Sequence, residues 1–493
     1  MIMTDKSSVY LHTAFIFLLM AFMCITYFAN DQHCINRLTA FVINYILTSS
    51  IFLIVYHRKN KTDLLSPVIG FVVLLFLYSV ASAVDVETNL TTYYGDYISD
   101  DTLTQYYAIC LIGLSGLMLG ILAVKTEISS KVHLKLPSNR LIRQCIIAMG
   151  IVLGAVFAVN LTDFFDFLHI KSYGEMALIS RVEKMKDSTA GLVEVFTQKI
   201  PIAYILSSAT ILMFKRHWLL RLVGFTIIVD YLVVNTLSGW RGLVISAAVT
   251  VFAYYHYRVR EIKLRTGIMI GSFLYLFMNV MSIVRVTSNP LEMLSVFWDY
   301  FSVYGAKFLQ LSSSGELIVG ENLMRLIQGI SDGETHFSYG WSIITELMVF
   351  MPRIFFDERP LPLNEQFVEV FYPGVREIGG GYGFFFLQEG YWAFGAVGVF
   401  IFMFCYGLIT QKIYQKFRKY CNNDLVLLSY GGIYYALVIS SVRNGILGSV
   451  KATLMSLIPF VIVYVALKVF RSLKAASRIN SKLQRNGIEE PVH

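Results

Sequence analysis

The most unusual run in the chain covers residues 377–395, where the sequence reads Glu-Ile-Gly-Gly-Gly-Tyr-Gly-Phe-Phe-Phe-Leu-Gln-Glu-Gly-Tyr-Trp-Ala-Phe-Gly. Four glycines within five residues let the backbone approach a ligand or a helix closely and adopt positive φ angles. Glu389 follows, about one turn above the edge of an expected membrane span, where its carboxylate could be a general base for a sugar hydroxyl. The rings of Tyr382, Tyr391 and the more distant Trp341 could stack on pyranose rings. The structural alternative is an interfacial aromatic belt with a snorkelling glutamate.

Arginines form the second pattern. Arg241, Arg285, Arg353 and Arg443 are all expected on the outer side of the membrane, where the charge rule disfavours cations. A guanidinium group binds phosphate oxygens through a bidentate fork and stays charged at any relevant pH. We therefore predict that these arginines bind a lipid pyrophosphate. A lipid-headgroup contact or a loop salt bridge would explain any single one of them.

The run Asp-Gly-Glu-Thr-His at residues 332–336 is spaced like a weak metal site or an Asp-x-Asp sugar-nucleotide motif. A glycine turn with solvated acids is the favoured interpretation, and His336 is a reserve candidate for a catalytic base. The chain has no Walker loop, no GxGxxG and no GxSxG, and its six cysteines show no CxxC or metal spacing. We predict no metal site, no cofactor and no structural disulfide.

The elements that must position these residues follow from composition. The chain of 493 residues is 56% hydrophobic and only 15% charged, too few charges to cover an aqueous surface. Its apolar residues come in blocks of about 17–25, the length that crosses a bilayer as a helix. The formal net charge of +8 resides in short loops between these blocks. The positions of these charges therefore indicate which loops are cytoplasmic, and nucleic-acid binding is not expected.

The sequence predicts an all-α, polytopic integral membrane protein with about 12 transmembrane helices and both termini in the cytoplasm. Basic loops all fall on one side in this arrangement, which supports it. The expected spans cover roughly 9–28, 38–56, 66–84, 105–124, 144–160, 197–214, 221–237, 242–257, 266–284, 385–410, 424–441 and 452–470.

Four regions follow from these spans. Residues 1–284 hold helices one to nine with a smaller loop on the outer side at 161–196, and residues 285–384 form a large loop on the outer side. Residues 385–470 hold the last three helices, and 471–493 form a cytoplasmic tail. The large loop is rich in aromatic and aliphatic residues, so we expect short amphipathic helices there rather than disorder.

Three short motifs carry a family resemblance: Ser-Gly-Trp-Arg-Gly at 238–242, Met-Pro-Arg at 351–353 followed by Arg-Pro at 359–360, and the glycine-rich run from Gly379 to Gly395. With them, the chain resembles the O-antigen polymerase family of Gram-negative bacteria, the oligosaccharide repeat-unit polymerases called Wzy. The hydropathy layout is similar along nearly the whole chain, including two large outer loops.

The resemblance implies a glycosyltransferase of the bacterial inner membrane with its active site facing the periplasm. The growing glycan would pass from undecaprenyl pyrophosphate to the non-reducing end of a new lipid-linked repeat unit. The implied partners are the donor and acceptor lipid-linked oligosaccharides, membrane lipids and a chain-length regulator protein. Arginines would neutralise the leaving pyrophosphate without a metal, and Glu389 would deprotonate the acceptor hydroxyl.

Two alternatives stay open. An O-antigen ligase, which transfers the glycan to lipid A core, shares the topology and the large loop; the glycine-rich run with Glu389 favours the polymerase. A flippase or transporter of lipid-linked oligosaccharides would instead have short outer loops and charged residues in mid-span. Asp230 is the clearest acid of that kind, and a hydrogen-bonded structural role explains it equally well.

Overall fold

The computed structural model describes the central membrane region and most of the segment before the last spans. The described residues are 34–60, 64–89, 92, 95–125, 241–258, 260–263, 265–267, 269–273, 317, 319–348, 360–377, 382–421 and 424–450, with isolated positions at 218, 222, 295, 298, 299, 302, 454, 465, 469, 472, 473 and 477. Arg285, Arg353, Asp230 and the expected loop at 161–196 lie outside this part.

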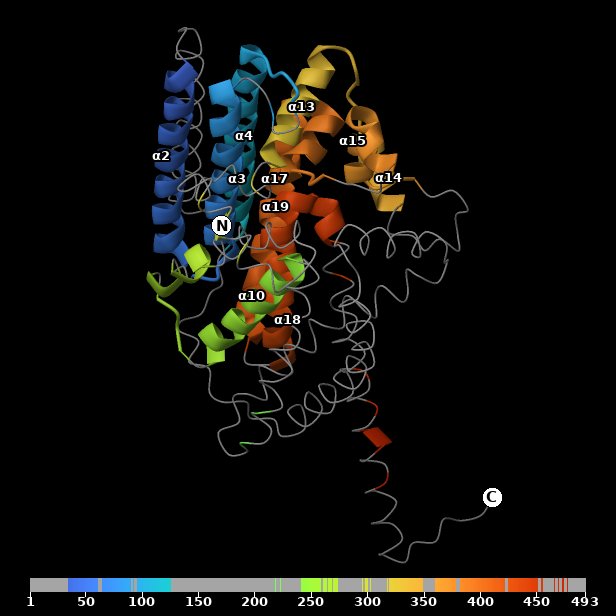
Figure 1. Ribbon diagram of the computed structural model, residues 1–493. Coiled ribbons are helices and arrows are strands. Elements are labelled where there is room, and N and C mark those ends of the chain that lie inside the picture. Colours follow the sequence, from blue (N-terminus) through green and yellow to red (C-terminus); the bar gives the residue numbers. More distant parts are fainter. Residues whose placement is uncertain are drawn as a thin grey trace, which may run out of the picture.

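The described part is helical and contains no strand. Its elements are α2 (Cys34–Asn60), α3 (Pro67–Asn89), α4 (Asp100–Ala123), α10 (Arg241–Arg258), α13 (Val319–Ser331), α14 (Trp341–Met348), α15 (Leu363–Phe371), α16 (Pro373–Glu377), α17 (Phe386–Tyr420), α18 (Asp424–Tyr434), the π-helix η5 (Tyr435–Ser440) and α19 (Ser441–Asn444). In Figure 1, α13, α14 and α15 gather at one end of the bundle, with α10 and α18 toward the other.

Within the described residues, α2, α3, α4 and α17 are each long and apolar enough to cross a membrane. They coincide with four of the expected spans, those at 38–56, 66–84, 105–124 and 385–410. The prediction of a multi-pass, all-helical membrane protein is therefore confirmed. The total of about 12 spans and the cytoplasmic termini stay predictions.

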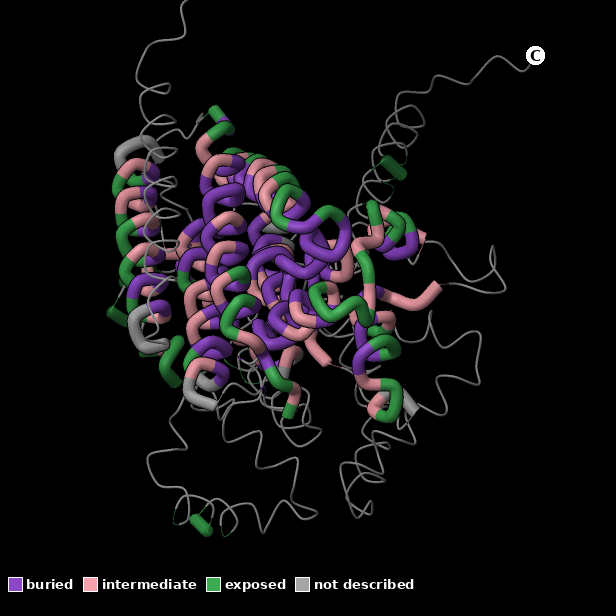
Figure 2. Tube along the Cα trace, turned by 90° about the horizontal axis from the view of Figure 1, so that it is seen from above, coloured by how far each residue is buried: buried purple, intermediate pink, exposed green. Residues whose placement is uncertain are grey.

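The centre of the bundle is the contact between α4 and α17. In the apolar window of α4, 72% of the residues are buried, against 28% in α2, so α4 is central and α2 peripheral. Figure 2 shows the buried residues gathered in the middle of the bundle. A Cβ on Gly116 or Gly120 of α4 would overlap the carbonyl oxygens of Phe400 or Phe404 of α17. Small residues of this kind let membrane helices pack at close range.

Replacing Gly120 with alanine is expected to weaken folding, because its Cβ would push α4 and α17 apart. Overpacking a tight contact costs about 1–3 kcal/mol in free energy of unfolding. The melting temperature of the detergent-solubilised protein measures the effect. Gly374→Ala in α16 is the matched control, because no atom lies within 4 Å of its Cβ position. Equal melting temperatures for the two variants would contradict the tight contact.

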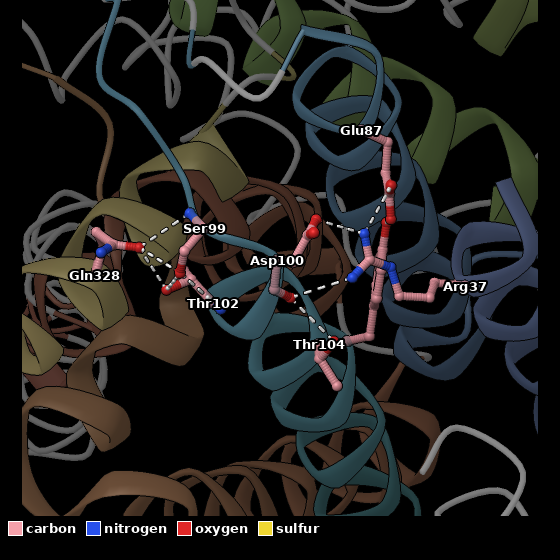
Figure 3. Close-up of polar contacts among 8 residues, drawn as sticks. Arg37, Glu87, Ser99, Asp100, Thr102, Thr104 and Gln328 are labelled. Carbon is pink, nitrogen blue, oxygen red and sulfur yellow. Dashed lines mark hydrogen bonds and ion pairs between the residues drawn. The ribbon is translucent and has the colours of Figure 1, made fainter. Parts of the chain in front are cut away.

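The helix α13 is inserted into the bundle rather than lying on its surface. A Cβ on Gly320 would clash with Tyr106 of α4 and Ser82 of α3, and the Ser82 hydroxyl donates to the Leu317 carbonyl at 3.1 Å. At the other end of α13, Gln328 Oε1 accepts hydrogen bonds from the Ser99 and Thr102 hydroxyls and the Ser99 amide (Figure 3).

One arginine ties three helices together at the same end of the bundle. Arg37 of α2 pairs with Asp100 of α4 at 2.7 Å and lies 3.7 Å from the carboxylate of Glu87 of α3 (Figure 3). Glu87 also accepts from the Tyr107 hydroxyl at 2.8 Å. Burial raises the pKa of Glu87 above its usual value, while Tyr107 and Arg37 oppose that shift. At the end of the bundle where α13 lies, polar contacts therefore stabilise the helices as well as packing.

The helix α17 is broken near its beginning, a feature the sequence analysis did not anticipate. Phe394 has φ −147° and Gly395 has φ 62°, neither of them helical. A Cβ on Gly390 would lie 2.8 Å from backbone atoms of Gly398, so the chain folds back on itself across the break. The 25 residues from 396 to 420 (420 − 396 + 1) extend about 37 Å as a helix, enough to span the hydrocarbon core. Residues 386–393 therefore form a separate short helix.

Candidate active site

The segment before α17 is held by backbone contacts to two distant parts of the chain. The amide of Phe384 donates to the carbonyl of Arg443 at 2.7 Å, and the Asn322 side chain donates to the carbonyl of Gly383 at 2.7 Å. A Cβ on Gly383 would meet Val319 at 2.8 Å, which explains one glycine of the glycine-rich run. These contacts join the end of the glycine-rich run, at Gly383, to α13 and to the end of α19.

Glu389 lies in the first turn of α17, where Gln388 accepts the Phe385 amide at 2.6 Å and fixes the start of the helix. The Glu389 side chain is only 2% exposed. Its two oxygens lie 3.1 and 3.4 Å from the Leu447 amide nitrogen, which donates to them. No cation of the described residues forms an ion pair with it. A buried carboxylate needs such hydrogen bonds, because it has lost its hydration.

The partner of Glu389 is the start of another helix. The helix α19 ends at Asn444. The next residue, Gly445, has a φ of 81° that only glycine adopts easily, and a new helical segment begins at Ile446. The first amides of a helix lack intrahelical acceptors. Glu389 therefore caps this helix from a distance of 58 residues along the chain.

A second buried carboxylate, Glu346 of α14, lies near Glu389, and the sequence analysis missed it. Glu346 is 4% exposed, accepts the Leu363 amide at 2.8 Å and acts electrostatically on Glu389. One of its oxygens lies 4.0 Å from the Cβ position of Gly448. The signal in the sequence was a single acid in the otherwise uncharged run Trp-Ser-Ile-Ile-Thr-Glu-Leu-Met at 341–348.

Glu346→Gln is expected to keep the fold, because the amide oxygen of glutamine can still accept the Leu363 amide. Glu346→Ala leaves that buried donor without its acceptor, which costs about 1–3 kcal/mol in free energy of unfolding. Thermal unfolding in detergent distinguishes the two variants. If both lower the melting temperature equally, the hydrogen bond to Leu363 is not what Glu346 contributes to stability.

Two of the four predicted pyrophosphate-binding arginines belong to the described part. Arg443 is the last basic residue of α19, and its carbonyl accepts the Phe384 amide, so its backbone adjoins the Glu389 turn. Arg241 is the first residue of α10, and the next residue, Gly242, packs against the Tyr435 hydroxyl in η5. Tyr435 precedes Arg443 by eight residues (443 − 435), or roughly two helical turns. The π-helix η5 begins at Tyr435 and ends three residues before Arg443; such a distortion is frequent near functional sites.

The predicted glycan-binding rings are dispersed. Tyr391 is buried and packs edge-on against Phe337 with ring centroids 5.7 Å apart. Tyr382 is half-buried and packs edge-on against Tyr372 at 4.8 Å. Trp341 begins α14 and is exposed. Of these three rings, only Tyr391 belongs to the same short helix as Glu389, and the three binding roles stay predictions.

The residues around His336 form the glycine turn that was favoured for them. Gly333 has φ 76° and lies two residues after the end of α13. Asp332 accepts from Gln328, and Glu334 pairs with Arg325 at 2.6 Å. His336 itself is exposed in the α13–α14 connection. Within the part of the chain that the structure describes, no contact joins it to Glu389, so its role as a reserve base stays a prediction.

A polar network holds Tyr372, the residue against which the Tyr382 ring packs. The Tyr372 hydroxyl donates to Asp96 at 2.5 Å, and Asp96 lies 3.4 Å from Arg325 of α13. Burial and the hydrogen bond to Asp96 raise the pKa of Tyr372 well above its usual value, so its hydroxyl keeps its proton. The network fixes the segment 95–99 to α13 and to the end of α15.

Comparison with known families decides the identity of the chain. The sequence model of the O-antigen polysaccharide polymerase Wzy matches residues 10–474, nearly the whole chain. The chain belongs to the Wzy family. Searches of the curated proteins and of the solved structures found no significant match. This Wzy-family chain is therefore a multi-pass membrane enzyme, a polymerase of the glycosyltransferase type that acts in O-antigen polymerisation. The resemblance noted in the sequence is confirmed.

Proposed function

We propose that this Wzy-family polymerase transfers the growing glycan from undecaprenyl pyrophosphate to the non-reducing end of a new lipid-linked repeat unit. The reaction takes place at the periplasmic face of the inner membrane. Residues 285–384 form the large periplasmic loop in this scheme, and the helices α13 to α16 lie within those bounds. The observation that carries the proposal is the buried Glu389, held beside the Arg443 turn at the α13 end of the bundle.

The proposed chemistry is a single displacement. The acceptor hydroxyl oxygen forms a bond to the anomeric carbon of the donor, the bond from that carbon to the pyrophosphate oxygen breaks, and undecaprenyl pyrophosphate leaves. Glu389 takes the hydroxyl proton. An ionised carboxylate offers about four lone-pair sites, and the Leu447 amide does not occupy them all.

The leaving pyrophosphate needs positive charge. Arg443 and Arg241 belong to neighbouring helices, since α10 packs against η5 and η5 leads into α19. We propose that they bind the pyrophosphate together with Arg353 and Arg285. Fixed guanidinium groups stabilise developing charge without further reorganisation, so the proposed reaction is independent of a metal. We also propose that a chain-length regulator protein is a partner.

The test is a deletion strain complemented with variants of Arg241, Arg353 and Glu389, whose surface polysaccharide is separated on a gel. For a polymerase, the ladder is expected to collapse to core plus a single repeat unit while protein levels hold. Complete loss of surface glycan with accumulation of lipid-linked polymer would identify a ligase instead. Loss of glycan together with lipid-linked repeat units retained in the cytoplasmic leaflet would identify a flippase. An unchanged ladder would exclude these residues from the site.

A further inference from the structure

The helix α14 has its polar side inward and its apolar side outward. Its buried residues are polar: Ser342, Thr345 and Glu346. Its exposed large side chains are apolar: Trp341 at 63%, Ile344 at 49% and Leu347 at 51% of full exposure. An amphipathic helix at an aqueous surface has the opposite arrangement, with its apolar face against the core. The surroundings of the exposed face must therefore be apolar.

The exposed residues form one surface. They are three positions apart, and residues at that spacing lie on the same face of a helix. The polar face is occupied within the protein, because Glu346 accepts the Leu363 amide and Thr345 accepts from the Gln366 side chain at 3.2 Å. The orientation of α14 is thus fixed by contacts on its polar side, and the apolar residues are not free to rotate inward.

This surface continues onto a helix that spans the membrane. The Ser338 amide, just before α14, donates to the Trp392 carbonyl at 2.9 Å, and a Cβ on Gly340 would lie 3.0 Å from the Phe394 ring. From Phe394 to Ile409, the exposed large side chains of α17 are apolar as well: Phe394, Val397, Ile401 and Ile409. The exposed face of a spanning helix contacts lipid. The α14 face therefore adjoins a surface that is already in the bilayer.

We propose that α14 lies in the membrane interface, with Trp341, Ile344 and Leu347 inserted among lipid acyl chains. Amphipathic helices bury an apolar face about 5–10 Å into the boundary between headgroups and chains, and tryptophan concentrates at that depth.

The opposite face of α14 carries Glu346, which is thereby held at the level of the lipid headgroups. One of its oxygens lies 4.0 Å from the Cβ position of Gly448, in the helical segment whose Leu447 amide donates to Glu389. This inference concerns the position of α14 in the bilayer and does not rest on the proposed reaction. It replaces the glycan-binding role expected for Trp341, because a ring among acyl chains does not stack on a sugar.

Site-directed fluorescence in nanodiscs tests the proposal. A single cysteine is introduced by Ile344→Cys in full-length protein whose six native cysteines are replaced by alanine, and is labelled with an environment-sensitive dye. The expected result is blue-shifted emission that phosphatidylcholine brominated in mid-chain quenches and aqueous iodide does not. Glu365→Cys is the matched control, on an exposed polar position of α15, where iodide is expected to quench and brominated lipid is not.

Two outcomes overturn the proposal. If iodide quenches position 344 as it does position 365, the face is in water. If neither quencher reaches position 344, protein covers the face, and a second copy of the chain is the candidate. Should the cysteine-free protein fail to fold, the native Trp341 serves instead: brominated lipid must quench more tryptophan fluorescence in the wild type than in Trp341→Phe. If brominated lipid quenches the wild type and Trp341→Phe equally, Trp341 does not contact lipid and the proposal is wrong.

Discussion

Glu389→Gln is expected to lower the polymerisation rate about 10²–10⁴-fold, the usual contribution of a general base, without unfolding the protein. Glutamine has nearly the same shape and can still accept the Leu447 amide through its carbonyl oxygen, but it cannot take a proton from the acceptor sugar. The measurement is the rate of glycan elongation by purified protein with lipid-linked repeat units.

Three comparisons separate catalysis from structure at this position. Glu389→Ala removes both the base and the helix cap, so it is expected to lower the melting temperature as well as the rate. Glu389→Asp keeps a carboxylate but on a side chain one methylene shorter, farther from the acceptor hydroxyl, and should retain part of the activity. Glu365→Gln, an exposed change on α15, should alter neither quantity. A wild-type rate for Glu389→Gln would leave Glu389 with only its capping role.

Gly445→Ala is expected to have the second-largest effect, because two independent penalties coincide there. Its φ of 81° lies in the left-handed region, which costs an L-residue about 1–2 kcal/mol. A Cβ would also collide with Oε1 of Glu389. The carboxylate would have to leave the Leu447 amide, so we expect a loss of elongation activity similar to that of Glu389→Ala, together with a lower melting temperature.

The control for Gly445→Ala is Gly333→Ala. Gly333 has φ 76°, close to that of Gly445, but no atom lies within 4 Å of its Cβ position. The difference between the two alanine variants therefore isolates the collision with Glu389 from the backbone strain. Equal losses of activity would show that the contact between Gly445 and Glu389 is unimportant for the reaction.

Local patterns in the sequence predicted the architecture well, because hydropathy and charge act over short stretches of chain. The blocks at 38–56, 66–84 and 105–124 are membrane-length helices, and the glycine-rich run does leave the backbone room to approach its neighbours at Gly383. The break at Phe394–Gly395 was not predicted, because glycine is common in membrane helices and Phe-Gly does not stand out in an apolar block.

The partners of the site could not be predicted, because they are distant in sequence. The contact of Glu389 with Leu447 and the bridge between Phe384 and Asn444 depend on how the helices are arranged, which periodicity does not encode. Glu346 was missed for a related reason. A sequence pattern assigns the apolar face of a helix to the protein interior, and in α14 that face is outside.

The interruption in α17 has a mechanical consequence. A spanning helix tilts or shifts when the thickness of the bilayer changes, since it must keep its apolar length matched to the hydrocarbon. An unbroken helix would transmit that movement along its axis to any group at its end. The continuous helix stops at Phe394 and Gly395. Glu389 instead accepts a hydrogen bond from the Leu447 amide, at the start of a neighbouring helix. The carboxylate therefore does not lie at the end of a continuous helical axis. Movement of the spanning helix reaches it only through the sideways packing of Gly390 on Gly398, while its hydrogen bond to Leu447 ties it to the neighbouring helix.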